Sequence, residues 1–301
     1  QADYGITDMT ALANIAVAGS FMAGLGVLLA GLLAVAHKRF YIFEDPRIDA
    51  VDELLPRNNC GACGTAGCRA FAEAVIQGSL DPGQCTVCTP DERQAIADFL
   101  GVAVGEHEKR VARLACAGGN HVARMRAHYD GLATCRAAHL VAGGGKGCAW
   151  GCLGFGDCET VCDFDAIHMD NHGLPNVVDD LCTACGDCVE ICPRQLFSLH
   201  PISHRLWVAC NNQGFGAEEE TQCDVICNAC GRCAVDAPGA VAIVNHLAVV
   251  DYTKNALAAH TAIERCPTGA IVWLDREHGV VKGRQARKVI RHEPLATGGR
   301  A

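Results

Sequence analysis

The sequence predicts an α+β protein with a single N-terminal transmembrane helix, a small helical domain and two tandem units of one repeated plan. Three observations predict this architecture. Near the N-terminus, a stretch of about 26 residues carries no charge. Further along, the 21 cysteines fall mostly into runs with two-residue spacing. In the second half of the chain, a three-cysteine run followed by an alternating apolar segment occurs twice.

Composition and charge narrow the classes of function. The 301 residues suffice for several domains, but aromatic residues make up only 5% of them and supply few large side chains for a core. An odd number of cysteines in CxxC runs argues against a secreted disulfide scaffold and for metal or iron–sulfur ligation in a reducing compartment. The net charge of −9 argues against nucleic acid as a partner. The sequence shows no P-loop and no GxGxxG motif after a strand, so no nucleotide site is predicted.

Residues 1–40 are predicted to form a membrane anchor. The uncharged stretch from Ala11 to Ala36 would extend about 39 Å as a helix, which is enough to cross a bilayer with some tilt. A signal peptide is the alternative, but the stretch lacks a basic segment before it and its apolar run is too long. Lys38 and Arg39 follow the stretch, while Asp3 and Asp8 precede it. The positive-inside rule therefore places the N-terminus outside and the rest of the chain in the cytoplasm.

Residues 41–104 are predicted to be a small helical domain that holds one [4Fe–4S] cluster, called cluster 1. Its four cysteines have the spacing C-x2-C-x4-C-x16-C, and they are Cys60, Cys63, Cys68 and Cys85. Adjacent glycines let the backbone wrap closely around a cluster. An amphipathic helix is expected from Arg69 to Gln77. Structural zinc is the alternative.

After a linking segment at 105–147, residues 148–210 are predicted to form a ferredoxin-like unit with two clusters. One run contains Cys148, Cys152, Cys158 and Cys162, and the other, followed by a proline, contains Cys182, Cys185, Cys188 and Cys192. In two-cluster ferredoxins the last cysteine of each run binds the cluster of the other run. Cluster 2 would therefore use Cys148, Cys152, Cys158 and Cys192. Cluster 3 would use Cys182, Cys185, Cys188 and Cys162. A hairpin is expected between the runs.

Residues 211–276 repeat this plan with one cluster lost. The run Cys227, Cys230, Cys233 lacks its usual fourth cysteine, because Ala237 stands there. In the companion run, non-cysteine residues (Asn255, Ala258 and Thr261) lie near the first three positions, and only Cys266 remains. Under the crossover rule the four missing ligands belong to one cluster and the four retained ones to the other. Cluster 4 would therefore use Cys227, Cys230, Cys233 and Cys266.

Several chemistry-bearing residues remain outside these sets. Four cysteines flank the ferredoxin-like units and are candidates for a further four-cysteine site, with buried free thiols as the alternative; they are Cys116, Cys135, Cys210 and Cys223. Cys88 has no predicted role. His168 and His172 lie in the expected hairpin, where residues four apart do not share a helix face, and are discounted as ligands.

Residues 277–301 are predicted to be a solvated basic tail that contains Lys282, Arg284, Arg287, Lys288 and Arg291.

An anchor helix, "NNCGACGTAGCRAFAEAV", "GGGKGCAWGCLGFGDCETVC" and tandem ferredoxin-like units occur together in this order. The combination resembles the B subunit of the Rnf ion-translocating electron-transport complex, in its long form, over nearly the whole chain. The resemblance implies an iron–sulfur electron-transfer subunit that exchanges electrons with soluble ferredoxin and with flavin-bearing and membrane-embedded subunits. It implies ferredoxin:NAD oxidoreduction coupled to Na⁺ or H⁺ movement, with no substrate chemistry on this chain itself.

About four [4Fe–4S] clusters are expected, or five if the flanking cysteines also bind one. Two other functions stay open at this point. The chain could relay electrons in another membrane oxidoreductase with a quinone, thiol or haem partner, or it could be a metal-stabilised interaction scaffold without redox activity.

Overall fold

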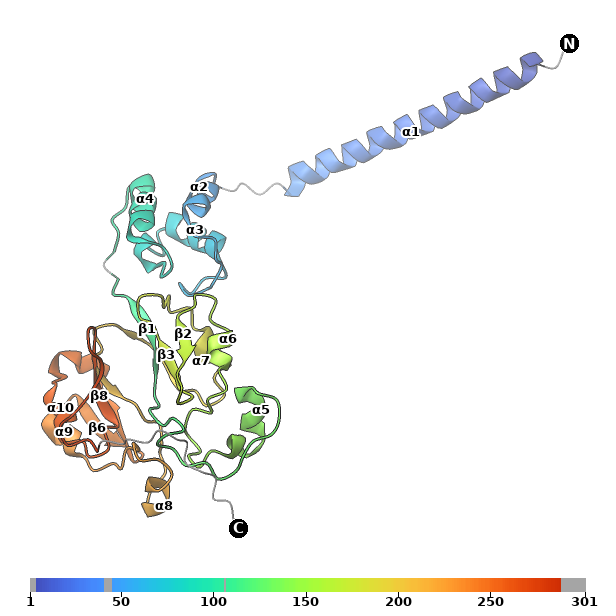
Figure 1. The fold of residues 1–301 in the computed structure, drawn as a ribbon. Coiled ribbons are helices and arrows are strands. Elements are labelled where there is room, and N and C mark those ends of the chain that lie inside the picture. The colour runs from blue at the N-terminus through green and yellow to red at the C-terminus, as the bar shows by residue number, and fades with distance from the viewer. Residues whose placement is uncertain (1–3, 41–44, 106, 288–301) are drawn as a thin grey trace. The chain divides into compact units, whose positions relative to one another are not determined.

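A computed structural model describes residues 4–40, 45–105 and 107–287, with side chains from residue 13 onward. The chain divides into two compact units at Ala50 and Val51. The first unit contains helix α1 (Tyr4–Phe40), the long helix of Figure 1. Its segment Ala13–Phe40 has a mean hydropathy of 2.1 and buries no side chain within the chain, so it is long and apolar enough to span a membrane. The predicted apolar helix is confirmed, and it extends beyond both ends of the uncharged stretch from Ala11 to Ala36.

The helical domain places three helices around the first cysteine loop. They are α2 (Arg47–Leu54), α3 (Cys68–Ile76) and α4 (Pro90–Leu100), with a short 3-10 helix, η1 (Pro82–Gln84). Apolar side chains of all three are fully buried, including Val51, Phe71 and Ile96. Helix α3 confirms the amphipathic helix expected at Arg69–Gln77. Helix α4 begins with a capping box in which Thr89 and Glu92 satisfy each other's backbone N–H groups.

The first ferredoxin-like unit has two pairs of antiparallel strands. Strand β1 (Arg110–Leu114) pairs with β4 (Phe197–Pro201), with Leu114 opposite Phe197. Strands β2 (Ile167–Met169) and β3 (Pro175–Val177) form the predicted hairpin. Helices α6 (Asp157–Thr160) and α7 (Asp187–Ile191) carry cysteines of the two runs. Because β1 lies in the segment predicted as a linker, the unit begins about forty residues earlier than its first predicted residue, 148.

The second unit repeats the arrangement and is seen with α9, α10, β6 and β8 in Figure 1. Strand β5 (Leu206–Val208) pairs with β8 (Ile271–Asp275), and β6 (Val241–Val244) forms a hairpin with β7 (Leu247–Val250). The helices are α9 (Arg232–Asp236), η3 (Tyr252–Leu257) and α10 (Thr261–Glu264). Strand β5 thus lies before the predicted boundary at 210 but pairs with a strand of this second unit.

The predicted basic tail is in part a strand. Strand β9 (Gly279–Lys282) pairs with β8 and makes a three-stranded sheet of β5, β8 and β9. The Arg284 side chain then pairs with Glu264, with 2.8 Å between Nε and Oε2. Strand pairing satisfies backbone groups that a solvated tail would leave to water. Lys288 and Arg291 lie outside the described residues.

Two insertions interrupt the repeated plan. Each follows the first strand of its unit and precedes that unit's first run of cysteines. The first contains α5 (Cys135–Leu140) and η2 (Ala142–Gly145), and the second contains α8 (Ala217–Glu220). Equivalent backbone bonds anchor their beginnings: Ala115 N–H donates to Leu196 O at 2.8 Å, and Ala209 N–H donates to Ala270 O at 2.7 Å. Each insertion therefore begins at the same point of the repeated plan, directly after the first strand of its unit.

Apolar side chains fill the place where the second unit would hold its second cluster. Ala237, at the lost ligand position, is 2% exposed and belongs to the apolar core that also includes Ile263. Ala258, near another lost position, packs against the same core. Tyr252 contributes its ring there and donates a hydrogen bond from its hydroxyl to Leu206 O at 3.1 Å. At the position where the repeated plan would put a ligand sulfur, the second unit therefore has packed carbon groups.

Strand β7 provides a matched test of this core, because its last two residues are valines of opposite exposure. Val250 is 8% exposed and lies in the core, whereas Val249 is 42% exposed. We expect Val250→Ala to lower the free energy of unfolding by about 1.5–3 kcal/mol through lost apolar burial. The control Val249→Ala should change it by less than about 0.5 kcal/mol. Anaerobic denaturant titration of the cluster-loaded protein measures both, and equal losses would contradict the packing described here.

Candidate iron–sulfur centres

Site 1 is a single cavity in the helical domain, lined by all four cysteines predicted for cluster 1. They are Cys60, Cys63, Cys68 and Cys85. Cys68 begins α3, and its backbone N–H donates to Asn59 Oδ1 at 2.9 Å, which ties the loop to the helix start. Gly61 and Gly64 turn the loop in the left-handed region that favours glycine. The side chains of Leu55 and Phe71 supply an apolar wall.

Cys88 lies beside site 1 and has a role that the sequence did not reveal. Its side chain is 2% exposed, and its thiol donates a hydrogen bond to Cys85 that lowers the pKa of Cys85. The Arg93 guanidinium binds Cys88 O at 2.8 Å from Nη2 and holds this turn. A donor aimed at a ligand sulfur stabilises its thiolate form, so Cys88 fits an outer-shell partner of site 1.

Site 2 is a cavity in the first ferredoxin-like unit, and its cysteines differ from the predicted set. They are Cys135, Cys152, Cys158 and Cys192. Cys148, predicted for cluster 2, lines a different cavity, and Cys135 takes its place. The physical reason is the insertion: Asp157 accepts hydrogen bonds from the backbone N–H groups of Cys135 at 2.9 Å and Arg136 at 3.2 Å. These bonds hold the start of α5 against α6, next to Cys158.

Site 3 is formed by the set predicted for cluster 3, which are Cys162, Cys182, Cys185 and Cys188. Cys188 lies close enough to the other three that each opposes its ionisation electrostatically. Backbone N–H groups point at two of the sulfurs: Ala112 N lies 3.4 Å from Cys182 Sγ, and Ala166 N lies 3.4 Å from Cys162 Sγ. Site 3 and site 2 share one buried core, which contains both Cys158 and Cys188.

Site 4 is a cavity in the second unit, lined by all four cysteines predicted for cluster 4. They are Cys227, Cys230, Cys233 and Cys266. The structure thus brings Cys266 from the distant companion run to the three cysteines of the first run. Ile243, Ala248 and Ile271 line the same cavity and give it an apolar wall.

The local backbone of these loops follows from a few residue types. In the run of site 3, Ala184 and Gly186 have positive φ, and in the run of site 4 Ala229 and Gly231 do. Each glycine immediately precedes a short helix, α7 or α9. Glycine adopts this left-handed geometry without strain, and the turn directs the three cysteines of each run to one point.

Burial favours the protonated form of three of these thiols. It raises the pKa of Cys152, Cys158 and Cys188 to about 12. Such thiols become thiolates near neutral pH when iron replaces the proton. All 21 cysteines are free of disulfides. Four-cysteine groups in apolar cavities with N–H groups aimed at sulfur fit [4Fe–4S] clusters.

Zinc fits these groups less well. A zinc ion with Zn–S bonds of about 2.3 Å needs its ligands gathered tightly around one point. Within the described residues, no three His, Cys, Asp or Glu side chains are arranged to hold a single metal ion. In a [4Fe–4S] cluster each cysteine binds a different iron, so its sulfurs stand farther apart.

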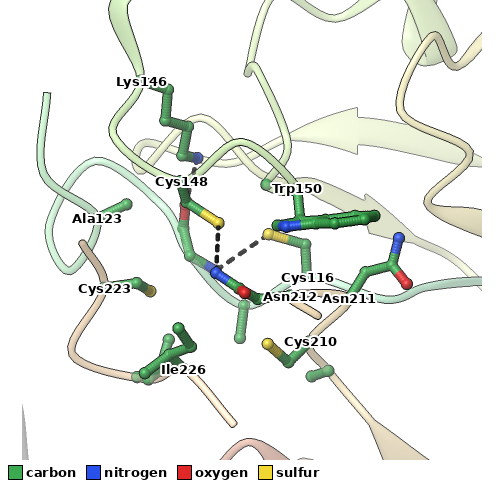
Figure 2. Close-up of a pocket in the computed structure, with 15 residues that line it drawn as sticks. Cys116, Ala123, Lys146, Cys148, Trp150, Cys210, Asn211, Asn212, Cys223 and Ile226 are labelled. Carbon is green, nitrogen blue, oxygen red and sulfur yellow. Dashed lines mark hydrogen bonds between the residues drawn. The ribbon is translucent and has the colours of Figure 1, made fainter. Parts of the chain in front are cut away.

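The remaining predicted cysteines lie together in one more cavity. Cys116, Cys210 and Cys223 line it with Cys148, as Figure 2 shows. The predicted extra set is therefore changed by the same exchange, with Cys148 in place of Cys135. Twenty of the 21 cysteines now fall into five groups of four, and Cys88 is left over.

His168, discounted as a ligand, has its Nδ1 3.9 Å from the Asp165 carboxylate.

Comparisons with known proteins agree with this iron–sulfur chemistry. Residues 55–87 match a family model described as "Putative Fe-S cluster", and residues 150–196 match one described as "4Fe-4S dicluster domain". The first match contains site 1, and the second contains most of sites 2 and 3.

Relatives cover most of the chain. The B subunit of the Na(+)-translocating ferredoxin:NAD(+) oxidoreductase complex of Acetobacterium woodii is 37% identical over 82% of this chain and 74% of its own length. The B subunit of the proton-translocating ferredoxin:NAD(+) oxidoreductase complex of Clostridium ljungdahlii is 37% identical over 83% of this chain and 89% of its own. The B subunit of an ion-translocating oxidoreductase complex of Methanosarcina acetivorans is 36% identical over 83% and 95%.

The exchange of Cys135 and Cys148 can be tested by iron analysis. Because Cys135 lies at site 2, we expect Cys135→Ala to remove about four iron atoms per chain together with the site 2 EPR signal. Leu140→Ala is the matched control: Leu140 is an exposed residue of the same helix, α5, and its truncation should leave the iron content unchanged. Full iron content in Cys135→Ala, measured after anaerobic purification, would refute this grouping.

A second variant tests site 4. Cys266→Ala should remove about four iron atoms, because the three cysteines of the first run then lack their fourth ligand. Cys266→Ser keeps a weak oxygen ligand and should retain part of that cluster. Iron content and EPR after dithionite reduction distinguish these results, and complete retention of iron in Cys266→Ala would show that Cys266 is not a ligand.

Proposed function

Because this chain belongs to the family of B subunits of ion-translocating oxidoreductase complexes, we propose that it carries single electrons between soluble ferredoxin and its partner subunits. Its part in the complex is iron–sulfur electron transfer, and it is an oxidoreductase subunit. The observation that carries the proposal is the gathering of cysteines into groups of four that line shared cavities, in a chain that shares over four fifths of its length with these relatives.

Cysteines, backbone N–H groups and apolar side chains have different roles in this electron transfer. We propose that sites 1, 2, 3 and 4 each ligate a [4Fe–4S] cluster, which when bound accepts and releases one electron. Cysteine thiolates fix the iron. Backbone N–H groups such as Leu196 N, 3.5 Å from Cys192 Sγ, stabilise negative charge on sulfur. Apolar side chains line part of each cavity at sites 1 and 4, which lowers the local polarity and with it the reorganisation that an electron transfer requires. Passage of an electron between such sites needs no proton transfer, so the walls need not supply an acid or a base.

Partners and location follow from the same family. The chain is a membrane-associated subunit of a multi-subunit complex. We propose that its electrons reach flavin-bearing and membrane-embedded subunits, in ferredoxin:NAD oxidoreduction coupled to Na⁺ or H⁺ movement. The basic last turn of α1 (His37, Lys38 and Arg39) supports an outside N-terminus with the iron–sulfur region in the cytoplasm.

Stopped-flow mixing with reduced ferredoxin tests the electron-transfer role. Reduced two-cluster ferredoxin, mixed anaerobically with the oxidised full-length protein, should bleach the broad visible absorption of the bound clusters. Oxidised ferredoxin is the control and should leave the absorption unchanged. A protein that dithionite bleaches and ferredoxin does not would contradict ferredoxin as the partner and favour a quinone, thiol or haem partner.

Vesicles of known sidedness test the orientation. Trypsin added to everted membrane vesicles should cleave the region that follows α1, because that region would face the medium. In right-side-out vesicles the same region should resist until detergent is added. Cleavage in right-side-out vesicles alone would reverse the proposed orientation without affecting the cluster sites.

A further inference from the structure

The two ferredoxin-like units meet at a cavity whose cysteines all lie outside both family matches. Four cysteines from four separate loops line it, and we call this group the junction site: Cys116, Cys148, Cys210 and Cys223. Cys116 and Cys148 come from the first unit and its insertion, and the other two come from the second. Figure 2 shows their side chains around the cavity, with Asn212, Trp150 and Lys146 beside them. The loops of the two units are joined here, since Ala117 N–H donates to Ala209 O at 3.0 Å.

The cysteines of the junction site occupy equivalent positions in the two units. Cys116 lies two residues after the end of β1, and Cys210 lies two residues after the end of β5. Cys148 precedes Cys152 with the spacing C-x3-C, and Cys223 precedes Cys227 with the same spacing. Each unit thus contributes an equivalent pair of cysteines. Two equivalent pairs that face each other across a pseudo-symmetric junction make one four-thiol site, which chance placement of free thiols would seldom produce.

Hydrogen bonds to sulfur repeat the same relation. Cys152 N–H donates to Cys116 Sγ at 3.4 Å, and Cys227 N–H donates to Cys210 Sγ at 3.4 Å. Gly118 N–H also donates to Cys116 Sγ, at 3.3 Å. The Asn212 side chain, 1% exposed, donates from Nδ2 to Cys148 Sγ at 3.5 Å. N–H groups aimed at several sulfurs are the environment that stabilises cluster-bound thiolates.

Charge and burial at the cavity also favour a cluster. The Lys146 ammonium lies at the cavity, where it binds Gly118 O and Cys152 O. Its positive charge offsets the negative charge of a cluster with four thiolates. Cys223 packs in a buried apolar core with Val225 and Ile226, which keeps bulk water from this side of the site.

We propose that the junction site ligates a fifth [4Fe–4S] cluster, which connects site 2 of the first unit to site 4 of the second. Cys152 is a site 2 residue and Cys227 is a site 4 residue, so each neighbouring site touches the junction site through one N–H···S contact. An electron that leaves site 2 reduces the junction cluster, which is reoxidised as site 4 takes that electron, and no bond forms or breaks. The relay order rests on the proposed function, whereas the presence of the cluster does not.

Metal analysis of the full-length protein decides whether the cluster exists. After anaerobic purification with full cluster loading, we expect about 20 iron and about 20 sulfide per chain, from five clusters. Native mass spectrometry should give the same number of clusters. About 16 iron with one zinc, or about 16 iron with four alkylatable thiols in addition to Cys88, would overturn the proposal.

Substitution then identifies the ligands. Cys210→Ala should lose about four iron and one EPR component, and Cys148→Ala should do the same from the other unit. Ile226→Val is the matched control, because it changes the lining of the same cavity without removing a thiol. If a cysteine variant does not fold, the iron and mass values of the parent protein decide instead. Full iron content in a folded Cys210→Ala would overturn the assignment.

The relay order has its own readout. In Cys210→Ala, the fast bleaching by reduced ferredoxin should fall by more than the one fifth that one missing cluster explains, because one unit is cut off from the other. A fall of only one fifth would overturn the connecting role. If the parent holds five clusters but ferredoxin reduces none of them, the proposed function fails and the fifth cluster stands.

Discussion

The bond between iron and buried thiolate is the interaction on which the rest of this fold depends. Ligand cysteines are themselves members of the buried cores: Cys233 in the second unit, Cys158 and Cys188 in the first, and Cys223 at the junction. With few aromatic residues and short strands, these cores bury too little apolar surface to be stable alone. Burial also opposes ionisation of the thiols, so cluster assembly and folding are one coupled process.

The internal repeat explains how one chain can hold so many sites. In each unit, the strand before the insertion pairs with the strand after the last cysteine run. The first residue of each insertion donates an equivalent backbone hydrogen bond, from Ala115 to Leu196 and from Ala209 to Ala270. Because the plan is duplicated, cysteines at equivalent positions of the two insertions come to face each other. A site between repeats needs no separate domain, and the proposed cluster would fix the two units against each other through metal bonds.

Local spacing and the ligand crossover between paired runs made sites 1, 3 and 4 predictable from the sequence. Their cysteines belong to runs whose spacing is set by a few turns, and the structure gathers the predicted sets. Cys135 was misplaced because it reaches site 2 across a long insertion, held by Asp157 in a contact with no spacing rule. No local pattern in the sequence indicates where strands β1 and β5 pair, because their partners are about 90 and 65 residues away. One signal was available: the C-x3-C spacing that links Cys148 to Cys152 recurs at Cys223 and Cys227.

The missing cluster of the second unit and the junction site are two parts of one arrangement. In a two-cluster ferredoxin-like unit, an electron passes along the unit from one cluster position to the other. Here Ala237 and Tyr252 fill one of those positions with packed carbon, so site 4 has no partner within its own unit. In the proposed relay an electron reaches site 4 from outside that unit, and the N–H···S contact between Cys227 and Cys210 lies where it would enter. A route between the repeats, as proposed, would not need a second cluster inside this unit.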